Sequence, residues 1–295
     1  ADRGLSVEEV LDSFIAQFYD DKPVPRLILL SHVIPSHELM AEALAIKAGA
    51  VILAVRAKGV EAKLKNDQSP VTEADVKAEH IILEGLGWHF PGIPIVAEEQ
   101  AAAGNLPKEL GNCFFLVDPL DGTKEFCAGR EDFTVNIALI EHGAPVAGLV
   151  YAPARAVLYA GSGEVAYRAS VADASGEAVV ERRIPLKPES EPKPRRVVAS
   201  RNHLTQETEE YLAGLKGCST VNIGSSLKFC LLAEGSADLY PRFSRTMEWD
   251  TAAGDAVLRA AGGRTETLDG EPLTYGKRNQ ADDSDFANPH FIARI

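Results

Sequence analysis

Cysteine is scarce in this sequence, and the few cysteines form no recognisable pattern. The 295 residues include 4 of them, at Cys113, Cys127, Cys218 and Cys230. No two have the spacing of a metal-binding pair, and a disulfide framework is implausible in a chain of this length. The sequence is therefore not that of a small disulfide-rich secreted protein, and we expect a reducing, cytoplasmic compartment.

Long apolar runs and an excess of positive charge are absent as well. No stretch reaches the ~20 apolar residues that a membrane-spanning helix needs, and the first residues show no signal-peptide pattern, so we expect no transmembrane segment. The formal net charge is −13, which argues against a protein that coats nucleic acid. A small anionic substrate is still compatible with this charge, because a bound metal reverses the local field.

The residues that are present suit a globular protein with a sizeable core. Hydrophobic residues make up 45% of the chain and charged residues 25%, and the length suits one large domain or two of moderate size. Residues 185–194 contain four prolines, which is typical of a linker. We predict an N-terminal extension over residues 1–36, an α+β domain over 37–193 and an α/β domain over 194–295.

Hydrophobic spacing predicts the order of helices and strands. Apolar residues recur at helical spacing from about residue 40 to 55, and Thr72 followed by Asp75 predicts a capping box that opens a helix over 72–86. Apolar runs predict strands at 93–97 and 114–117, and a hairpin that joins 133–141 to 145–152. Strands and helices alternate after residue 194. The pattern as a whole predicts a layered α/β fold.

One motif, Asp118-Pro-Leu-Asp-Gly-Thr123, directly follows the apolar strand at 114–117. Its proline and glycine are expected to turn the chain sharply. Such a turn aims the two carboxylates and the Leu120 carbonyl at one point, and hard divalent cations prefer oxygen ligands of this kind. The N–H groups of Gly122 and Thr123 then face a bound anion. Taken alone, the motif is equally compatible with a plain Asp-Gly turn after a core strand.

Further acidic residues occur at positions that each have a simple structural explanation. Asp75 suits a helix cap, Glu98 and Glu99 suit a solvated strand end, and Asp250 suits the N-cap of an alanine-rich helix. Their occurrence in one chain with the hexapeptide makes a shared metal site the stronger interpretation.

Two motifs together resemble a known family. Asp118-Pro-Leu-Asp-Gly-Thr123 and Trp249-Asp250-Thr-Ala-Ala-Gly254 are similar to the signature pair of the lithium-sensitive, magnesium-dependent phosphatases, which include inositol monophosphatase and fructose-1,6-bisphosphatase. The resemblance covers about residues 37–290. It implies an α-β-α-β-α sandwich of the inositol monophosphatase type, with a metal-binding phosphatase domain over 37–193, a substrate-binding domain over 194–295, and two or three Mg²⁺ ions per site.

The resemblance also implies individual roles. Thr123 and Asp75 match the pair that activates the attacking water. Ala97 stands where many members have glycine or serine before the glutamates, which leaves the ligands intact. The implied metal ligands are Glu98, Asp118, the Leu120 carbonyl, Asp121 and Asp250.

Other runs resemble one branch of that family, the bacterial 3′(2′),5′-bisphosphate nucleotidases. They are Lys124-Glu125-Phe126, residues 133–142, residues 200–203, Gly224-Ser-Ser-Leu-Lys-Phe-Cys230 and Leu239-Tyr-Pro-Arg-Phe243. Enzymes of this branch remove the 3′-phosphate from adenosine 3′,5′-bisphosphate and produce AMP in sulfate assimilation. This substrate is the small-molecule partner that the resemblance implies.

The second phosphate of such a substrate requires its own donors. Ser225 and Ser226 precede an expected helix, and Lys228 and Arg242 add positive charge. Taken singly, Ser225 suits an N-cap and both cations suit a solvated surface. With the resemblance, the substrate-binding set is Gly122, Thr123, Ser225, Ser226, Lys228, Arg242 and Asp250. His203 and Tyr240 are candidates to stack on the adenine, although an aromatic residue there equally suits the core.

Three functions are therefore considered. The first is a bisphosphate nucleotidase, the second an inositol monophosphatase, and the third an acidic metal-binding protein without turnover. The presence of both Thr123 and Asp75 argues against the third. The resemblance implies a place at the inner face of the cytoplasmic membrane, but no feature of the sequence explains such attachment, so we expect only the cytoplasmic side. Oligomeric state is not predicted.

The first residues differ from the rest of the chain. Residues 6–19 suit an amphipathic helix, which the prolines at 23 and 25 end. This segment resembles a stretch of a bacterial excinuclease, and we assign it no function.

Overall fold

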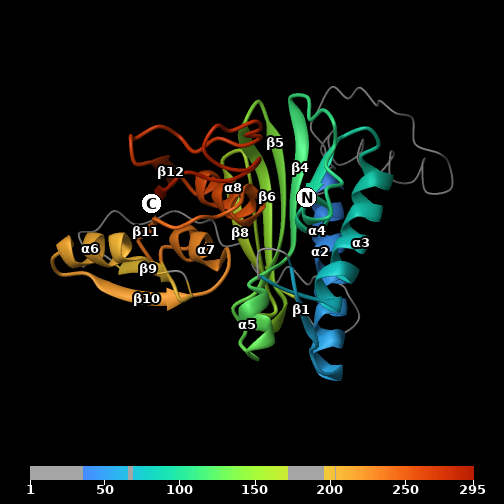
Figure 1. The fold of residues 1–295 in the computed structure, drawn as a ribbon, viewed down its shortest axis with the longest axis horizontal. Helices are drawn as coiled ribbons and strands as arrows, with labels where there is room; N and C mark the ends of the chain where they lie inside the picture. The colour runs from blue at the N-terminus through green and yellow to red at the C-terminus, as the bar shows by residue number, and fades with distance from the viewer. Residues whose placement is uncertain (1–35, 66–68, 172–195, 203) are drawn as a thin grey trace, which may run out of the picture.

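The computed structural model describes residues 36–65, 69–171, 196–202 and 204–295. They form two large β-sheets, with helices outside and between them, and a short two-stranded sheet of β1 and β2 (Figure 1). A six-stranded sheet has the order β3-β4-β5-β6-β7-β8, and a five-stranded sheet has the order β10-β9-β11-β13-β12. The layered α/β fold predicted from the sequence is confirmed. The predicted helix at 6–19, the linker at 185–194 and His203 lie outside the described residues.

The elements have the following bounds. The helices are α2 (Ser36–Lys58), α3 (Glu73–His89), α4 (Glu98–Ala102), α5 (Thr123–Cys127), α6 (Gln206–Gly214), α7 (Leu227–Ala233) and α8 (Ala252–Ala260), with 3₁₀ turns η1 (Pro153–Arg155) and η2 (Glu248–Asp250). The strands are β1 (Ala62–Leu64), β2 (Pro70–Thr72), β3 (Ile95–Ala97), β4 (Cys113–Asp121), β5 (Thr134–Glu141), β6 (Ala144–Ala152), β7 (Val157–Ser162), β8 (Val165–Ser170), β9 (Arg196–Ser200), β10 (Ser219–Ile223), β11 (Leu239–Arg242), β12 (Arg264–Thr267) and β13 (Phe291–Arg294).

In the larger sheet β4 lies between β3 and β5, and its residues are almost all buried. Its partner β5 continues through a tight turn into β6, as predicted. The two turn residues, His142 and Gly143, have φ of 50° and 77°, which suits the turn that matches the twist of a hairpin. Helices α2 and α3 cover one face of this sheet and bury side chains such as Ile52 and Ile82 against it (Figure 1).

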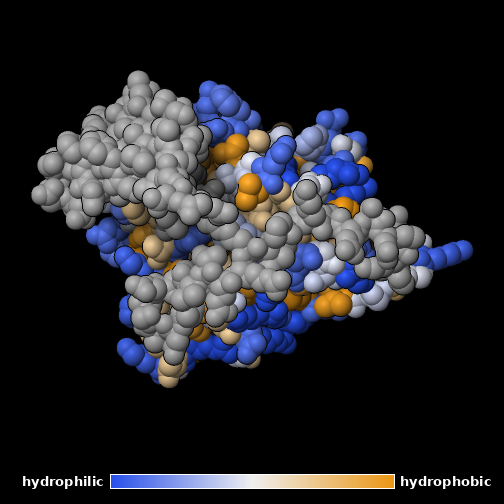
Figure 2. Space-filling view, turned by 180° about the vertical axis from the view of Figure 1, so that it is seen from behind, coloured by the Kyte–Doolittle hydropathy of each residue, from blue (hydrophilic) through white to orange (hydrophobic). Residues whose placement is uncertain are grey.

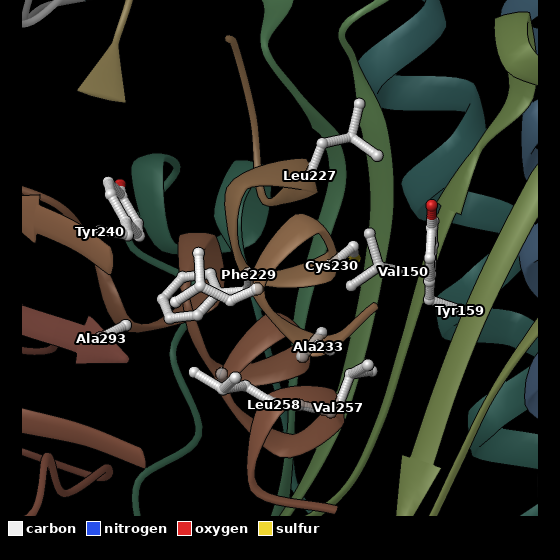
Figure 3. Close-up of a cluster of buried hydrophobic side chains, with 14 of the residues drawn as sticks. Val150, Tyr159, Leu227, Phe229, Cys230, Ala233, Tyr240, Val257, Leu258 and Ala293 are labelled. Atoms are coloured by element: carbon white, nitrogen blue, oxygen red, sulfur yellow. The ribbon is translucent and has the colours of Figure 1, made fainter. Parts of the chain in front are cut away.

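A second core lies on the opposite face, where α7 and α8 separate the two sheets (Figure 3). Phe229 of α7 contacts Tyr240 of the small sheet edge-on, with ring centroids 5.3 Å apart. The same cluster includes Val150 and Tyr159 of the large sheet. Because one apolar cluster joins residues from both sides of position 194, the two predicted domains share a core. The boundary itself lies outside the described residues and stays a prediction.

Helix α8 packs directly on the backbone of the large sheet. An added Cβ on Gly148 in β6 would lie 2.4 Å from the Ala253 carbonyl oxygen, and one on Gly161 in β7 would lie 2.7 Å from Val257 Cα. Only glycine permits an approach this close. The contact matters for function because α8 directly follows η2, which carries Asp250.

Polar residues cover most of the coloured surface on the rear face, and hydrophobic residues form small separate patches (Figure 2). Large exposed hydrophobic side chains, such as Trp88 and Val165, belong to different elements. Across the part of the chain that the structure describes, no helix has the length and apolarity needed to cross a bilayer.

Replacing Gly148 with alanine tests the α8 contact. Gly148→Ala must push α8 away from β6, because the obstructing atom is backbone, and we expect a loss of about 1–3 kcal/mol in the free energy of unfolding. Urea unfolding measures this loss. Gly214→Ala is the matched control, since no atom lies within 4 Å of its added Cβ and alanine favours the helix. Equal stability of Gly148→Ala and the native chain would contradict the contact.

Candidate active site

A single cavity collects the residues that the sequence singled out. It has a volume of about 220 Å³ and lies where the end of β4, the start of α7, the strand β11 and the turn η2 converge. Its lining includes Glu98, Asp118, Leu120, Asp121, Gly122, Thr123, Ser225, Ser226, Lys228, Arg242 and Asp250. Every predicted metal ligand and substrate contact is therefore in one place, although these residues span more than half of the sequence.

The hexapeptide adopts a different backbone from the one predicted. A sharp turn between Pro119 and Gly122 was expected, but β4 continues to Asp121 and carries an irregularity in its pairing with β5 between Asp118 and Asp121. Proline is tolerated there because it has no N–H to donate to the interrupted ladder. A bulge of this kind bends the strand and redirects its side chains. The chain turns only at Gly122, whose φ of 94° favours glycine.

Thr123 and Asp75 form the predicted pair. The Thr123 hydroxyl lies 3.1 Å from Asp75 Oδ1 and 3.1 Å from the Leu120 carbonyl oxygen, both of which accept hydrogen bonds. The other Asp75 oxygen accepts from the N–H and hydroxyl of Thr72, each at 2.7 Å, so the predicted capping box is present. Burial raises the pKa of Asp75, although its hydrogen bonds lower it. The raised pKa of Asp75 is closer to the value that a general base needs near neutral pH.

The remaining acids repel one another. Burial raises the pKa of Asp118 well above its usual value, and the charges of Glu98 and Asp121 raise it further. Burial, with the charges of Asp121 and Glu98, raises the pKa of Asp250 to about 8. A cation near these carboxylates relieves the repulsion, because an opposite charge favours their ionised form.

One cation of the chain already neutralises part of this charge. Lys65 Nζ lies 2.7 Å from Glu98 Oε1 and 2.5 Å from Glu99 Oε1. Burial lowers the pKa of Lys65, but both carboxylates raise it, with a net increase. Glu79 accepts the Glu99 N–H at 2.8 Å and fixes the start of α4. Sequence reasoning missed Lys65, because a lysine in a polar loop carries no signal of its partners.

The acidic residues suit Mg²⁺ only together with other ligands. Among the described residues, no group of three or more histidine, cysteine, aspartate or glutamate side chains is arranged to hold an ion by itself. Mg²⁺ in proteins is typically bound by one or two carboxylates, water and substrate phosphate. The Leu120 carbonyl and the carboxylates beside it provide such a partial set, so the residues fit the ion.

Ser226 connects the acidic residues of the site to the start of α7, the helix that carries Lys228. Its N–H donates to Asp121 Oδ2 at 2.6 Å, and its hydroxyl lies 2.8 Å from the same oxygen and 2.6 Å from the Asp250 carbonyl oxygen. Asn136 on β5 also donates to the Ser226 hydroxyl at 2.8 Å. These contacts position Asp121. The predicted contact from Ser226 to substrate stays a prediction.

Lys228 and Arg242 are buried in the cavity wall, with 5% and 7% of their surface exposed. The alternative interpretation, that both are solvated surface charges, is therefore wrong. Lys228 Nζ donates to the Ser225 carbonyl at 2.5 Å and lies 5.2 Å from the centre of the Tyr240 ring. Burial and the nearby Arg242 lower the pKa of Lys228 to about 8. Ser225 is not an N-cap, because α7 begins after Ser226. Tyr240 lines the cavity but packs in the core as well.

The turn that carries Asp250 is held by residues that the sequence analysis missed. The buried Glu248 accepts the N–H groups of Gly276 and Lys277 at 2.6 and 2.9 Å. Asn288 donates to the Met247 carbonyl at 2.8 Å, and Asp250 Oδ2 accepts the Met247 N–H at 2.8 Å. These partners come from the loop before β13, and sequence spacing alone does not indicate such contacts.

Comparison with known proteins shows the family to which the chain belongs. The model of the inositol monophosphatase family matches residues 36–293. The chain belongs to the inositol monophosphatase family. A second model, the UvrC ribonuclease H-like domain, matches residues 1–66, consistent with the resemblance of the N-terminal segment.

Several relatives match most of the chain. The 3′(2′),5′-bisphosphate nucleotidase CysQ of Escherichia coli O157:H7 is 44% identical over 85% of this chain and 97% of its own length. CysQ of Salmonella typhimurium is 45% identical over the same shares. The crystal structure of CysQ from Bacteroides thetaiotaomicron superposes with a TM-score of 0.71 at 38% identity, and covers 88% of this chain and 97% of that one.

Asp250→Asn tests the repulsion among the acids. Because the pKa of Asp250 is raised on folding, its ionisation destabilises the metal-free fold as pH rises from about 4 to about 8. We expect Asp250→Asn to raise the melting temperature at pH 8 in chelator by at least roughly 2–4 °C. The same variant should lose the stabilisation that added Mg²⁺ gives the native chain.

Thermal scans at pH 5 and pH 8, with and without Mg²⁺, measure both effects. The exposed Asp269 provides the control variant Asp269→Asn, which should behave as the native chain does. A lower melting temperature of Asp250→Asn in chelator at pH 8 would contradict the proposed repulsion.

Proposed function

We propose that the chain hydrolyses the 3′-phosphate of adenosine 3′,5′-bisphosphate to give AMP and phosphate, in sulfate assimilation and nucleotide recycling. It is a phosphatase of the inositol monophosphatase family. The observation that carries the substrate is a cavity in which an acidic cluster faces two buried cations, Lys228 and Arg242. This pairing suits a molecule with one phosphate to be cut and one to be held. The high coverage of relatives named bisphosphate nucleotidase supports it.

The acidic half binds the phosphate that is cut. Glu98, Asp118, the Leu120 carbonyl, Asp121 and Asp250 would hold two or three Mg²⁺ ions, the metal typical of the family. When bound, Mg²⁺ stabilises the charge that develops on the phosphate and on the attacking and leaving oxygens. Phosphate monoesters hydrolyse very slowly without such help.

Thr123 and Asp75 act on the attacking water. The Thr123 hydroxyl orients the water, and Asp75 takes the proton through that hydroxyl, because the two are already hydrogen-bonded at 3.1 Å. The N–H groups of Gly122 and Thr123 contact the phosphate oxygens. Asp250 contacts the substrate on the side of the leaving group.

The cationic half binds the second phosphate. Arg242 Nε is buried, and within the described residues it has no hydrogen-bond partner, so it is available to an anion. Lys228 and Ser225 lie beside it in the wall. Charge-assisted contacts from these groups to phosphate favour a bisphosphate over a monophosphate. Ser226 contributes to the same half mainly by holding Asp121.

The two other candidate functions fit the site less well. An inositol monophosphate has no second phosphate for the buried cations. The solved inositol monophosphatases with which the chain superposes include one from Anabaena at 24% identity, which shows the fold alone. A metal-binding protein without turnover does not need the Thr123–Asp75 pair.

Thr123→Val tests the nucleophile pair. Valine keeps the shape of threonine but cannot orient the water or transfer its proton, so turnover should fall about 10²–10⁴-fold with stabilisation by Mg²⁺ retained. Phosphate release at saturating substrate measures the loss. Thr220→Val, on the exposed strand β10, is the control and should be unaffected. Near-native turnover of Thr123→Val would remove the pair from the mechanism.

Lys228→Met tests substrate choice. Methionine fills the same space without charge, so kcat/KM for adenosine 3′,5′-bisphosphate should fall about ten- to a hundredfold. Hydrolysis of inositol 1-phosphate should change far less. The exposed Lys216 provides the control Lys216→Met. An equal loss for both substrates would exclude Lys228 from the phosphate site, and a native preference for inositol 1-phosphate would favour the inositol monophosphatase instead.

A further inference from the structure

Glu125 is a buried carboxylate in the cavity without a role in the proposed mechanism. It lies on α5, two residues after Thr123, and only 3% of its surface is exposed. It lines the same cavity as Lys228 and Arg242. A carboxylate repels phosphate oxygens, so the presence of Glu125 in a cavity for a doubly phosphorylated molecule needs an explanation.

The side chain of Glu125 is held in a fixed position. Asn202, in the loop after β9, donates its side-chain N–H to Glu125 Oε1 at 2.5 Å. On the other side is Gly224, where an added Cβ would lie 2.7 Å from Glu125 Cγ. A glycine before α7 and an asparagine after β9 therefore hold one carboxylate of α5 between them.

Glu125 also lies between the two halves of the site. Electrostatic interactions connect Glu125 to Asp121 on the acidic side and to Lys228 on the cationic side, and all three side chains line the same cavity. In the proposed function, these sides bind the two phosphates, and the sugar that carries both phosphates must lie between them. The sugar hydroxyl next to the cut phosphate is a hydrogen-bond donor at this place, and a carboxylate only accepts.

We propose that the Glu125 carboxylate accepts a hydrogen bond from the hydroxyl adjacent to the phosphate that is cut, and so selects ribose over deoxyribose. The carboxylate has room for this bond, since an ionised carboxylate has about four acceptor positions, of which the Asn202 side chain occupies one on Oε1 and a backbone N–H occupies another. Glu125 is then a specificity-determining residue, and the inference rests on the proposed function.

The test compares adenosine 3′,5′-bisphosphate with its 2′-deoxy analogue. We expect the native chain to prefer the ribose form by about ten- to a hundredfold in kcat/KM, the usual effect of a hydrogen bond to a charged acceptor. Glu125→Ala should bring this ratio close to one. Glu125→Gln keeps the shape and a neutral acceptor, so its ratio should lie between the two. Glu131→Gln, an exposed glutamate six residues further on, should keep the native ratio.

Each outcome decides the proposal. Equal use of both substrates by the native chain would overturn it without any variant. So would a Glu125→Ala or Glu125→Gln variant that loses activity on both substrates by the same factor, because that result means Glu125 only anchors Asn202. Absence of phosphate release from the ribose form by the native chain would instead remove the proposed function, which is a distinct result.

Discussion

The crowding of buried carboxylates at the end of β4 is the constraint on which the rest of this molecule depends. Burial and the charges of Glu98, Asp121 and Asp250 raise the pKa of Asp118, and burial with the charges of Asp121 and Glu98 raises that of Asp250, so the fold must hold these carboxylates together against their repulsion. The backbone positions these residues, in addition to any countercharge. The irregular strand β4 orients Asp118 and Asp121. Glu98 lies at the start of α4, and Asp250 lies on η2, which Glu248 holds in place. A cation that binds here would relieve the repulsion and so recover the free energy of folding that the crowded carboxylates cost.

The second requirement is a fixed spacing between the acidic and the cationic side. The bridge from Ser226 to Asp121 and to the Asp250 carbonyl is short, and it lies at the start of α7, the helix that carries Lys228. Helices α7 and α8 then fill the space between both sheets. A substrate that must bridge two charge centres gains most from such preorganisation, because binding energy is not spent on bringing the centres into place.

Sequence spacing predicted what depends on local pattern. The capping box at Thr72, the β5–β6 hairpin and the layered fold follow from periodicity and turn residues, and the family motifs indicated the acids that line the cavity. The course of the hexapeptide was predicted wrongly, because Pro119 is as compatible with a bulged strand as with a turn. Lys65, Asn136, Asn202 and Asn288 were missed, since their partners lie far away in the sequence and single polar residues carry no positional signal.

The shared core has a consequence for how the molecule opens. Regions with their own hydrophobic cluster can unfold separately, whereas regions that share one tend to open together. The amide of Ser226 is bonded to Asp121 beside the cluster that joins both sheets. We therefore expect its proton to exchange with solvent only when the whole molecule unfolds. This amide of the active site would then be among the slowest-exchanging in the molecule, unlike amides of sites carried on surface loops.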